Sequence, residues 1–232
     1  MKILLLICVV AITLCGQNTR KPVFVSPKEL DVTDMLPSPP APNSWQDRME
    51  MAELHRLQDT RTEAEVAHAK ADDAEEDMFV FSTVLGARFS REKLPLTALL
   101  SDHLHNDEGI NVNPAKTAYH RLRPYFADAT IKPVCKINDN RADYSYPSGH
   151  STTGYLEGLT LALMVPEKRD QILTRADDYA HSRLVCGVHY PTDPVASKSV
   201  AYAMMGVIQQ NPQFKKEFEA ARSELRRTLG LP

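Results

Sequence analysis

Residues 146–165 read YPSGHSTTGYLEGLTLALMV, and this stretch is the most informative about the fold. From Ser151 onward it predicts a core helix, which Pro166 ends because proline cannot continue the hydrogen-bond ladder. Gly154 and Gly158 lie four residues apart, so they share one helix face and permit a neighbouring helix to pack closely. The sequence therefore predicts a buried helix that starts directly after a Ser-Gly turn.

The segments around this helix are also helical in character. Apolar spacing, capping residues and prolines predict further helices over residues 44–61, 62–77, 78–85, 93–105, 114–121, 167–186, 194–209 and 213–229. Met49, Leu54 and Leu57 are the expected core contacts of the first of these helices. A polar loop is expected over 125–147, and loops of that length are usually functional or disordered. With no repeat and no strand pattern of useful length, the fold class is all-α, a single-domain helical bundle.

The N-terminus has the organisation of an export signal. One lysine precedes about a dozen apolar residues, a core too short to span a membrane, so we expect residues 1–16 to be a signal peptide. A lipoprotein anchor at Cys15 is the alternative, although bulky Leu14 is unusual before a lipidated cysteine. Residues 17–43 form a proline-rich extended arm, and 44–232 form the helical domain. The mature protein is therefore expected to be periplasmic or secreted, without a membrane span.

The composition excludes some partners. The 232 residues are 43% hydrophobic and 25% charged, which is ordinary for a globular protein, and the formal net charge is −3. We therefore expect no nucleic-acid polymer and no anionic membrane as a bulk partner. Affinity for a small anion must come from a local cluster of cations.

Two cysteines, Cys135 and Cys186, remain after removal of the signal peptide. In an oxidising compartment an even pair indicates a disulfide. This bond would join the loop before Pro147 to the segment that carries Arg183 and His189. Two buried free thiols are the alternative, since free cysteine packs as a small hydrophobic residue.

The first block of residues that could take part in binding or catalysis contains Lys116, Arg123 and Pro124. Seven residues separate the two cations, so a single helix would project both from one face, and Pro124 would then stop that helix. Together with Arg121 they are also compatible with a solvated basic stripe that has no function. The blocks that follow favour the functional interpretation.

The second block is the turn Pro147-Ser148-Gly149-His150. The unpaired amides at a helix N-terminus suit an anion, and Gly149 lets the backbone approach a ligand. Ser148 would in any case cap the helix. A cation in the first turn opposes the helix dipole, so stability does not explain His150, whereas a proton carrier near phosphate oxygens does.

The third block contains Ser182-Arg183, His189 and Asp193. Asp193 followed by Pro194 is a typical helix start, with aspartate at the cap and proline at the first helical position. One carboxylate oxygen can cap while the other accepts a hydrogen bond from His189 and fixes its tautomer. The pair of imidazoles, His150 and His189, favours catalysis over simple binding.

Taken together, the pattern Lys-x6-Arg-Pro, Pro-Ser-Gly-His, Ser-Arg-x5-His-x3-Asp resembles the signature of the phosphatidic acid phosphatase type 2/haloperoxidase superfamily, and within it the bacterial class A non-specific acid phosphatases. The resemblance covers nearly the whole mature chain. It implies an all-α bundle of the acid phosphatase/vanadium haloperoxidase type, a phosphoric monoester hydrolase with no metal or other cofactor, and a small-molecule phosphomonoester as substrate. A homo-oligomer is compatible with it.

The resemblance also implies roles for the signature residues. His189 would attack phosphorus to form a phosphohistidine, with Asp193 orienting it, and His150 would protonate the leaving alcohol and then activate water. The phosphate oxygens would be bound by Lys116, Arg123, Ser148, Gly149 and Arg183.

The chain departs from these relatives after the signature. Pro194 and Lys198 stand where an aliphatic residue and a glycine are more frequent, which raises a question about the packing of that helix. Three alternatives remain open: a vanadate-dependent haloperoxidase, a lipid phosphatase, and a non-catalytic phosphate- or nucleotide-binding module on the same scaffold. Haloperoxidases tend to be larger, and the related lipid phosphatases usually carry several membrane spans.

Overall fold

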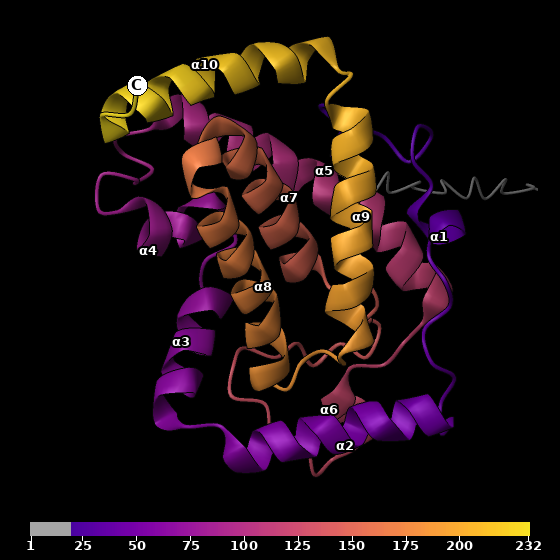
Figure 1. Cartoon of the computed structure of the whole chain (residues 1–232). Coiled ribbons are helices and arrows are strands. Elements are labelled where there is room, and N and C mark those ends of the chain that lie inside the picture. The colour runs from indigo at the N-terminus through magenta and orange to yellow at the C-terminus, as the bar shows by residue number, and fades with distance from the viewer. Residues whose placement is uncertain (1–19) are drawn as a thin grey trace, which may run out of the picture.

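The structure, a computed structural model, describes residues 20–232, and all of its regular elements are helices, which confirms the all-α prediction (Figure 1). The predicted signal peptide, residues 1–16 with Cys15, lies outside the described residues. Among the residues described, no helix combines the length and the apolar character that a membrane crossing requires. The elements are α1 (Val32–Met35), α2 (Trp45–Thr60), α3 (Glu63–Asp73), the 3-10 helix η1 (Met78–Phe81), α4 (Ser82–Leu85), α5 (Pro95–Tyr119), α6 (Pro124–Ala127), α7 (Gly149–Met164), the 3-10 helix η2 (Pro166–Lys168), α8 (Arg169–Val185), α9 (Thr192–Ile208) and α10 (Pro212–Leu229).

Helix α7 is the centre of the bundle. It packs against α8, α9 and α5, and most of its residues are buried (Figure 1). A methyl group added to Gly154 would overlap the ring of Tyr179, and one added to Gly158 would lie 3.1 Å from Cβ of Ala176. The two glycines therefore permit the close approach of α8, as the sequence predicted.

Helix α5 corrects one prediction. The two helices expected over 93–105 and 114–121 are one continuous helix, with Pro114 in its interior. Of the polar residues between the two expected helices, Asp107, Glu108 and Asn111 are buried. The carboxylate of Asp107 accepts the backbone amides of Val23, Phe24 and Val25 at 2.6–2.9 Å, so this face of the helix anchors the N-terminal arm.

The described part of the arm, residues 20–43, is extended apart from the short helix α1. Two tyrosines from the bundle hold it through its carbonyl groups. The Tyr119 hydroxyl donates to the carbonyl of Leu36 at 2.7 Å, and the Tyr146 hydroxyl donates to the carbonyl of Pro37 at 2.8 Å. The arm is thereby fixed along the bundle by hydrogen bonds as well as by apolar contacts.

Helix α2 crosses one end of the bundle, and α10 crosses the opposite end (Figure 1). Leu54 and Leu57 of α2 are buried as predicted, but Met49 is 51% exposed and is not a core contact. Met49 lies one turn from Trp45, which is 71% exposed, so both belong to the solvent face of the helix. The segment 78–85 is a buried pair of short helices, η1 and α4, in agreement with the expected buried helix.

Candidate active site

The candidate site lies at the end of the bundle that faces α2, where α7 begins, α8 ends and α9 begins (Figure 1). A cavity of about 150 Å³ at this end is lined by three of the predicted residues, Arg123, His150 and Arg183. The same walls carry three carboxylates that the sequence did not single out, Asp73, Glu76 and Asp143. The remaining predicted residues lie around these walls, deeper in the bundle.

His189 and Asp193 form the buried centre of the site. Nδ1 of His189 lies 3.0 Å from Oδ2 of Asp193, and the two residues are 1% and 0% exposed. Burial alone would raise the pKa of Asp193, but the hydrogen bond with His189 and the charge of Arg121 lower it, so the group is a carboxylate. A carboxylate only accepts hydrogen bonds, so Nδ1 carries the hydrogen and the lone pair lies on Nε2.

Nε2 of His189 lies 2.6 Å from Nη1 of Arg123. Burial and the charge of Arg123 hold the pKa of His189 well below its usual value, with Asp193 opposing them. His189 is therefore a neutral imidazole that directs its lone pair toward a cation, and hence toward any anion that the cation binds.

The cap predicted for α9 is wrong in detail. The helix begins at Thr192, two residues earlier than a cap at Asp193 would require, and the residue at its N-cap is Pro191. The Asp193 carboxylate instead accepts the backbone amide of Tyr190 at 2.9 Å and the Ser145 hydroxyl at 2.7 Å, besides His189. These three partners all use Oδ2, and Arg121 donates to Oδ1 at 2.7 Å, so both oxygens are occupied by groups outside the helix.

Lys116 and Arg123 converge, but not for the expected reason. Helix α5 ends at Tyr119, and His120 takes a left-handed conformation with φ of 52°, so the two cations do not share a helix face. Pro124 begins α6 rather than ending a helix. The predicted single helix face is therefore wrong.

What brings the two cations together is the loop before α7. Nζ of Lys116 donates to the carbonyl of Tyr144 at 2.9 Å, and Nε of Arg123 donates to the carbonyl of Asp143 at 3.1 Å. Burial and the charge of Arg123 lower the pKa of Lys116 to about 7. The two side chains are thus close enough for their charges to interact.

The start of α7 agrees with the prediction for Ser148. Its hydroxyl accepts the amide of Ser151 at 3.3 Å and caps the helix. A side chain at Gly149 would lie 3.3 Å from Oε1 of Glu108, a buried carboxyl whose pKa burial raises to about 7. A side chain at position 149 would therefore be crowded by Glu108 of α5, and His150 follows Gly149 in the first helical turn.

Arg183 reaches the same site from the end of α8. It is 3% exposed, and its Nη1 contacts Oδ1 of Asp73 at 2.5 Å. The other oxygen of Asp73 accepts the backbone amide of Lys136 at 3.0 Å. Arg183 is thus held by a carboxylate from α3 and lines the cavity.

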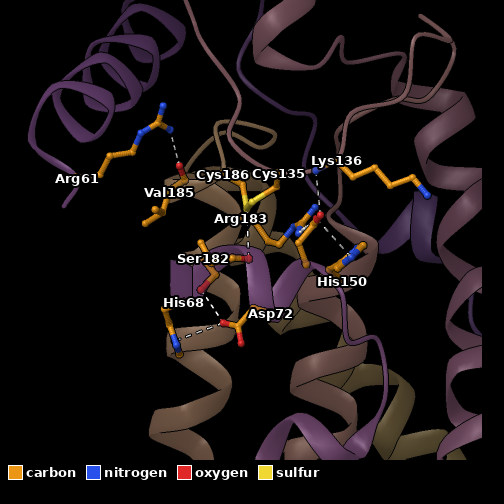
Figure 2. The surroundings of a disulfide bond; sticks show 12 residues. Arg61, His68, Asp72, Cys135, Lys136, His150, Ser182, Arg183, Val185 and Cys186 are labelled. Atoms are coloured by element: carbon orange, nitrogen blue, oxygen red, sulfur yellow. Dashed lines mark hydrogen bonds and ion pairs between the residues drawn. A yellow bond between two sulfur atoms is a disulfide. The ribbon is translucent and has the colours of Figure 1, made fainter. Parts of the chain in front are cut away.

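The predicted disulfide between Cys135 and Cys186 is confirmed, with Cα atoms 5.1 Å apart, and the alternative of two free thiols is excluded. Figure 2 shows it beside Arg183 and His150. The amide of Val134 also donates to the carbonyl of Cys186 at 3.1 Å. The bond therefore fixes the loop before α7 to the segment that leads to His189.

One group of residues outside the predicted site has spacing suitable for a metal ion. Donor atoms of His68, Asp72 and Asp178 lie within 4.8 Å of one another. Arg175 already contacts both carboxylates, including that of Asp178 at 3.0 Å. None of these residues is among the predicted catalytic or phosphate-binding residues.

Comparison with known proteins identifies the family. The model of the PAP2 superfamily matches residues 96–217, more than half of the chain. The chain belongs to the PAP2 superfamily. A non-specific acid phosphatase of Providencia stuartii is 30% identical over 203 residues, 84% of this chain and 81% of that protein. An acid phosphatase of Zymomonas mobilis and a non-specific acid phosphatase of Salmonella typhi are each 32% identical, over 62% and 63% of this chain and 55% and 59% of their own lengths.

The expected family is therefore confirmed, together with the enzyme class of its homologues, which are phosphoric monoester hydrolases named acid phosphatases. All the PAP2 signature residues from Lys116 to Asp193 lie inside the matched region. The two departures are accommodated. Pro194 lies in the first turn of α9, where a missing amide leaves no hydrogen bond unmade, and Lys198 pairs with Asp177 at 2.6 Å.

Sequence reasoning missed the residues that support this PAP2 site. Arg121, grouped with a solvated stripe, is buried, and it contacts Glu50 at 2.5 Å and Asp193 at 2.7 Å. Glu50, Asp73 and Glu76 lie outside the region that the family model matches. They come from segments that resembled solvated helix faces, so no local pattern pointed to them.

Proposed function

We propose that this chain is a metal-independent acid phosphatase that hydrolyses phosphate monoesters through a phosphohistidine at His189. The observation that carries the proposal is the orientation of His189. Asp193 fixes the hydrogen on Nδ1, and the lone pair on Nε2 lies 2.6 Å from a guanidinium nitrogen of Arg123. A phosphoryl group bound by Arg123 would lie next to the attacking atom.

In the first step, Nε2 of His189 forms a bond to phosphorus and the ester P–O bond breaks. A neutral imidazole suits this attack, because it is not repelled by an anionic ester. The leaving oxygen takes a proton from His150, which becomes neutral. Asp193 compensates the positive charge that develops on the His189 ring.

The transferred phosphoryl group is bound by cations and amides. Lys116, Arg123 and Arg183 supply the positive charge, and Ser148 and the Gly149 amide supply hydrogen bonds at the start of α7. Three cations at one site stabilise the charge on the equatorial oxygens, the role that metal ions have in many other phosphatases. Two of the three carboxylates on the cavity walls are paired with these cations, Asp143 with Arg123 and Asp73 with Arg183.

In the second step, neutral His150 takes a proton from water as the water oxygen attacks phosphorus. The P–N bond breaks, inorganic phosphate leaves, and His189 and the protonated His150 are restored. The same intermediate would transfer its phosphoryl group to an acceptor alcohol in place of water.

The two histidines must differ in protonation at the same pH. Burial and Arg123 lower the pKa of His189 well below its usual value, which keeps it neutral in mild acid. Burial and Arg183 also lower the pKa of His150, but the carboxylate of Glu76 opposes them. Activity should therefore fall below the pKa of His189 and above the pKa of His150, with a bell-shaped profile in the acid range.

Broad phosphomonoester specificity, including nucleotides, is part of the proposal. The cavity is small and lined largely by charged side chains, so it suits the phosphoryl group and leaves the alcohol portion at its opening. We also propose export to the periplasm or the medium. The Cys135–Cys186 disulfide supports this, because such bonds persist in oxidising compartments.

The direct test is hydrolysis of p-nitrophenyl phosphate at acidic pH, with EDTA and with vanadate in parallel reactions. We expect activity that resists EDTA, is inhibited by vanadate and is abolished in His189→Ala. Loss of activity on chelation would contradict the metal-independent mechanism. Bromide oxidation by the vanadate-loaded protein with peroxide would instead identify a haloperoxidase.

A further inference from the structure

The second histidine of the site has a carboxylate partner that the PAP2 signature does not contain. We propose that Glu76 is a positioning residue for His150, and that the two form a carboxylate–imidazole pair which fixes the tautomer of His150 and favours its protonated form. The inference rests on the proposed function, because it concerns the residue assigned there to proton transfer.

The geometry places the two groups in direct contact. Nε2 of His150 lies 2.8 Å from Oε1 of Glu76, the distance of a close ion pair. Glu76 lies between α3 and η1, on the wall of the same cavity that His150 lines. The Glu76 side chain is 46% exposed and the His150 side chain 20%, so the carboxylate is in contact with solvent while the imidazole is largely buried.

Three features of this environment oppose a positive charge on His150. The ring is largely buried, Arg183 of α8 carries a positive charge nearby, and the first turn of α7 carries the positive end of the helix dipole. A general acid must nevertheless be protonated before it can donate. A nearby negative charge is therefore required for the proposed role.

The groups that face His150 leave Glu76 as its main partner. The Tyr179 ring of α8 stacks at 6.5 Å and is apolar on its face. Oδ1 of Asp73 is 4.0 Å away, but Arg183 and the amide of Lys136 already occupy the two oxygens of this carboxylate. From α5, Glu108 lies against the neighbouring Gly149, and His105 is 3.9 Å from Oε2 of Glu76. The Oε1 atom is thus the oxygen that Glu76 offers to His150.

This contact serves both proton transfers. A protonated imidazole has two N–H groups, so Nε2 donates to Glu76 while Nδ1 carries the proton for the leaving oxygen. After that transfer, the hydrogen on Nε2 remains with Glu76, and Nδ1 has a lone pair that can accept a proton from water. The proton gained from water restores the starting state, and no other proton is required.

Titration of the His150 ring followed by NMR tests the pair without an activity measurement. In Glu76→Gln the pKa of His150 should fall by about one unit, the lower end of the effect of an opposite charge at this distance. Glu75→Gln, which removes the neighbouring exposed carboxylate, is the matched control and should leave the titration unchanged. The same pKa of His150 in the native protein and in Glu76→Gln would overturn the proposal.

Kinetics then test the consequence for catalysis. In Glu76→Gln the alkaline limb of kcat/KM should move to lower pH by the same amount, with a loss for an alkyl phosphate that reaches about tenfold above the native pKa of His150. The loss should be smaller for p-nitrophenyl phosphate, whose leaving group needs less protonation. Glu76→Asp, which keeps the carboxylate, should move the alkaline limb of kcat/KM part of the way back to its native pH.

A uniform loss at every pH and for both leaving groups would show a merely structural role and contradict the proposal. A native protein without phosphatase activity would instead contradict the proposed function. The NMR titration would still report on the pair in that case, so the two failures are distinguishable.

Discussion

The two histidine–carboxylate pairs of the site differ in almost every physical respect. His189 and Asp193 lie four residues apart, and both are almost fully buried. His150 and Glu76 come from distant segments, and the carboxylate is 46% exposed. Asp193 has four hydrogen-bond donors around it, from His189, Tyr190, Ser145 and Arg121.

This contrast corresponds to the two tasks that we propose for the pairs. A nucleophile must present one nitrogen in one orientation, which a buried and fully satisfied carboxylate enforces. An acid and base that changes its protonation twice in each turnover benefits from contact with water. The bundle therefore provides a rigid pair in its interior and a solvated pair at the mouth of the cavity.

Breaking the buried pair should have the largest effect. In Asp193→Asn the amide nitrogen can donate toward Nδ1, which moves the hydrogen of His189 to Nε2 and removes the attacking lone pair. We expect kcat to fall on the order of 10³- to 10⁴-fold, as in other histidines that lose their orienting carboxylate. Steady-state kinetics with p-nitrophenyl phosphate measure this loss, and circular dichroism checks that the fold is retained. A loss below tenfold would show that Asp193 does not set the tautomer.

The next largest effect is expected at Arg121, which contacts the carboxylates of Glu50 and Asp193. Arg121→Met leaves Glu50 and Asp193 as buried carboxylates without their cation, so the free energy of unfolding should fall by about 3–5 kcal/mol. Urea unfolding measures this change. Arg141→Met, at an exposed arginine, is the matched control and should change the stability little. Similar stabilities for the two variants would contradict a supporting role for Arg121.

The third prediction, with a smaller expected effect, concerns anion binding by Lys116 rather than proton transfer by His150 and Glu76. The pKa of Lys116 is lowered to about 7, so this cation is charged below that pH and loses its charge above it. Sulfate keeps a constant charge over this range, and its inhibition constant should rise about tenfold from about pH 6 to about pH 8. In Lys116→Met the inhibition constant should stay nearly flat. The same pH dependence in both proteins would assign the effect to another group.

The difference between the pairs also explains what the sequence could predict. His189 and Asp193 are close in sequence, so their spacing and the family signature identified the contact before the structure did. The disulfide was predictable for a similar reason, since Cys135 and Cys186 are the two cysteines outside the predicted signal peptide. Gly154 and Gly158 likewise predicted the close packing of α7 from a local pattern.

Contacts between distant segments were not predictable in this way. Glu76 and Arg121 have roles only because folding brings them against His150 and Asp193. Lys116 and Arg123 do come together, but the helix expected to align them ends at Tyr119, and loop carbonyls position them instead. Single-sequence patterns report periodicity within an element, and these features depend on how elements meet.

The central claim is that the buried pair carries the nucleophile and the solvated pair moves the protons. Its most direct test is to quench the enzyme during turnover of p-nitrophenyl phosphate under alkaline conditions, which preserve phosphohistidine, and to map the phosphoryl group by mass spectrometry. The account predicts a phosphoryl group on His189, at higher occupancy in His150→Ala because the water-activating base is absent. A phosphoryl group on another residue, or none in either protein, would contradict it.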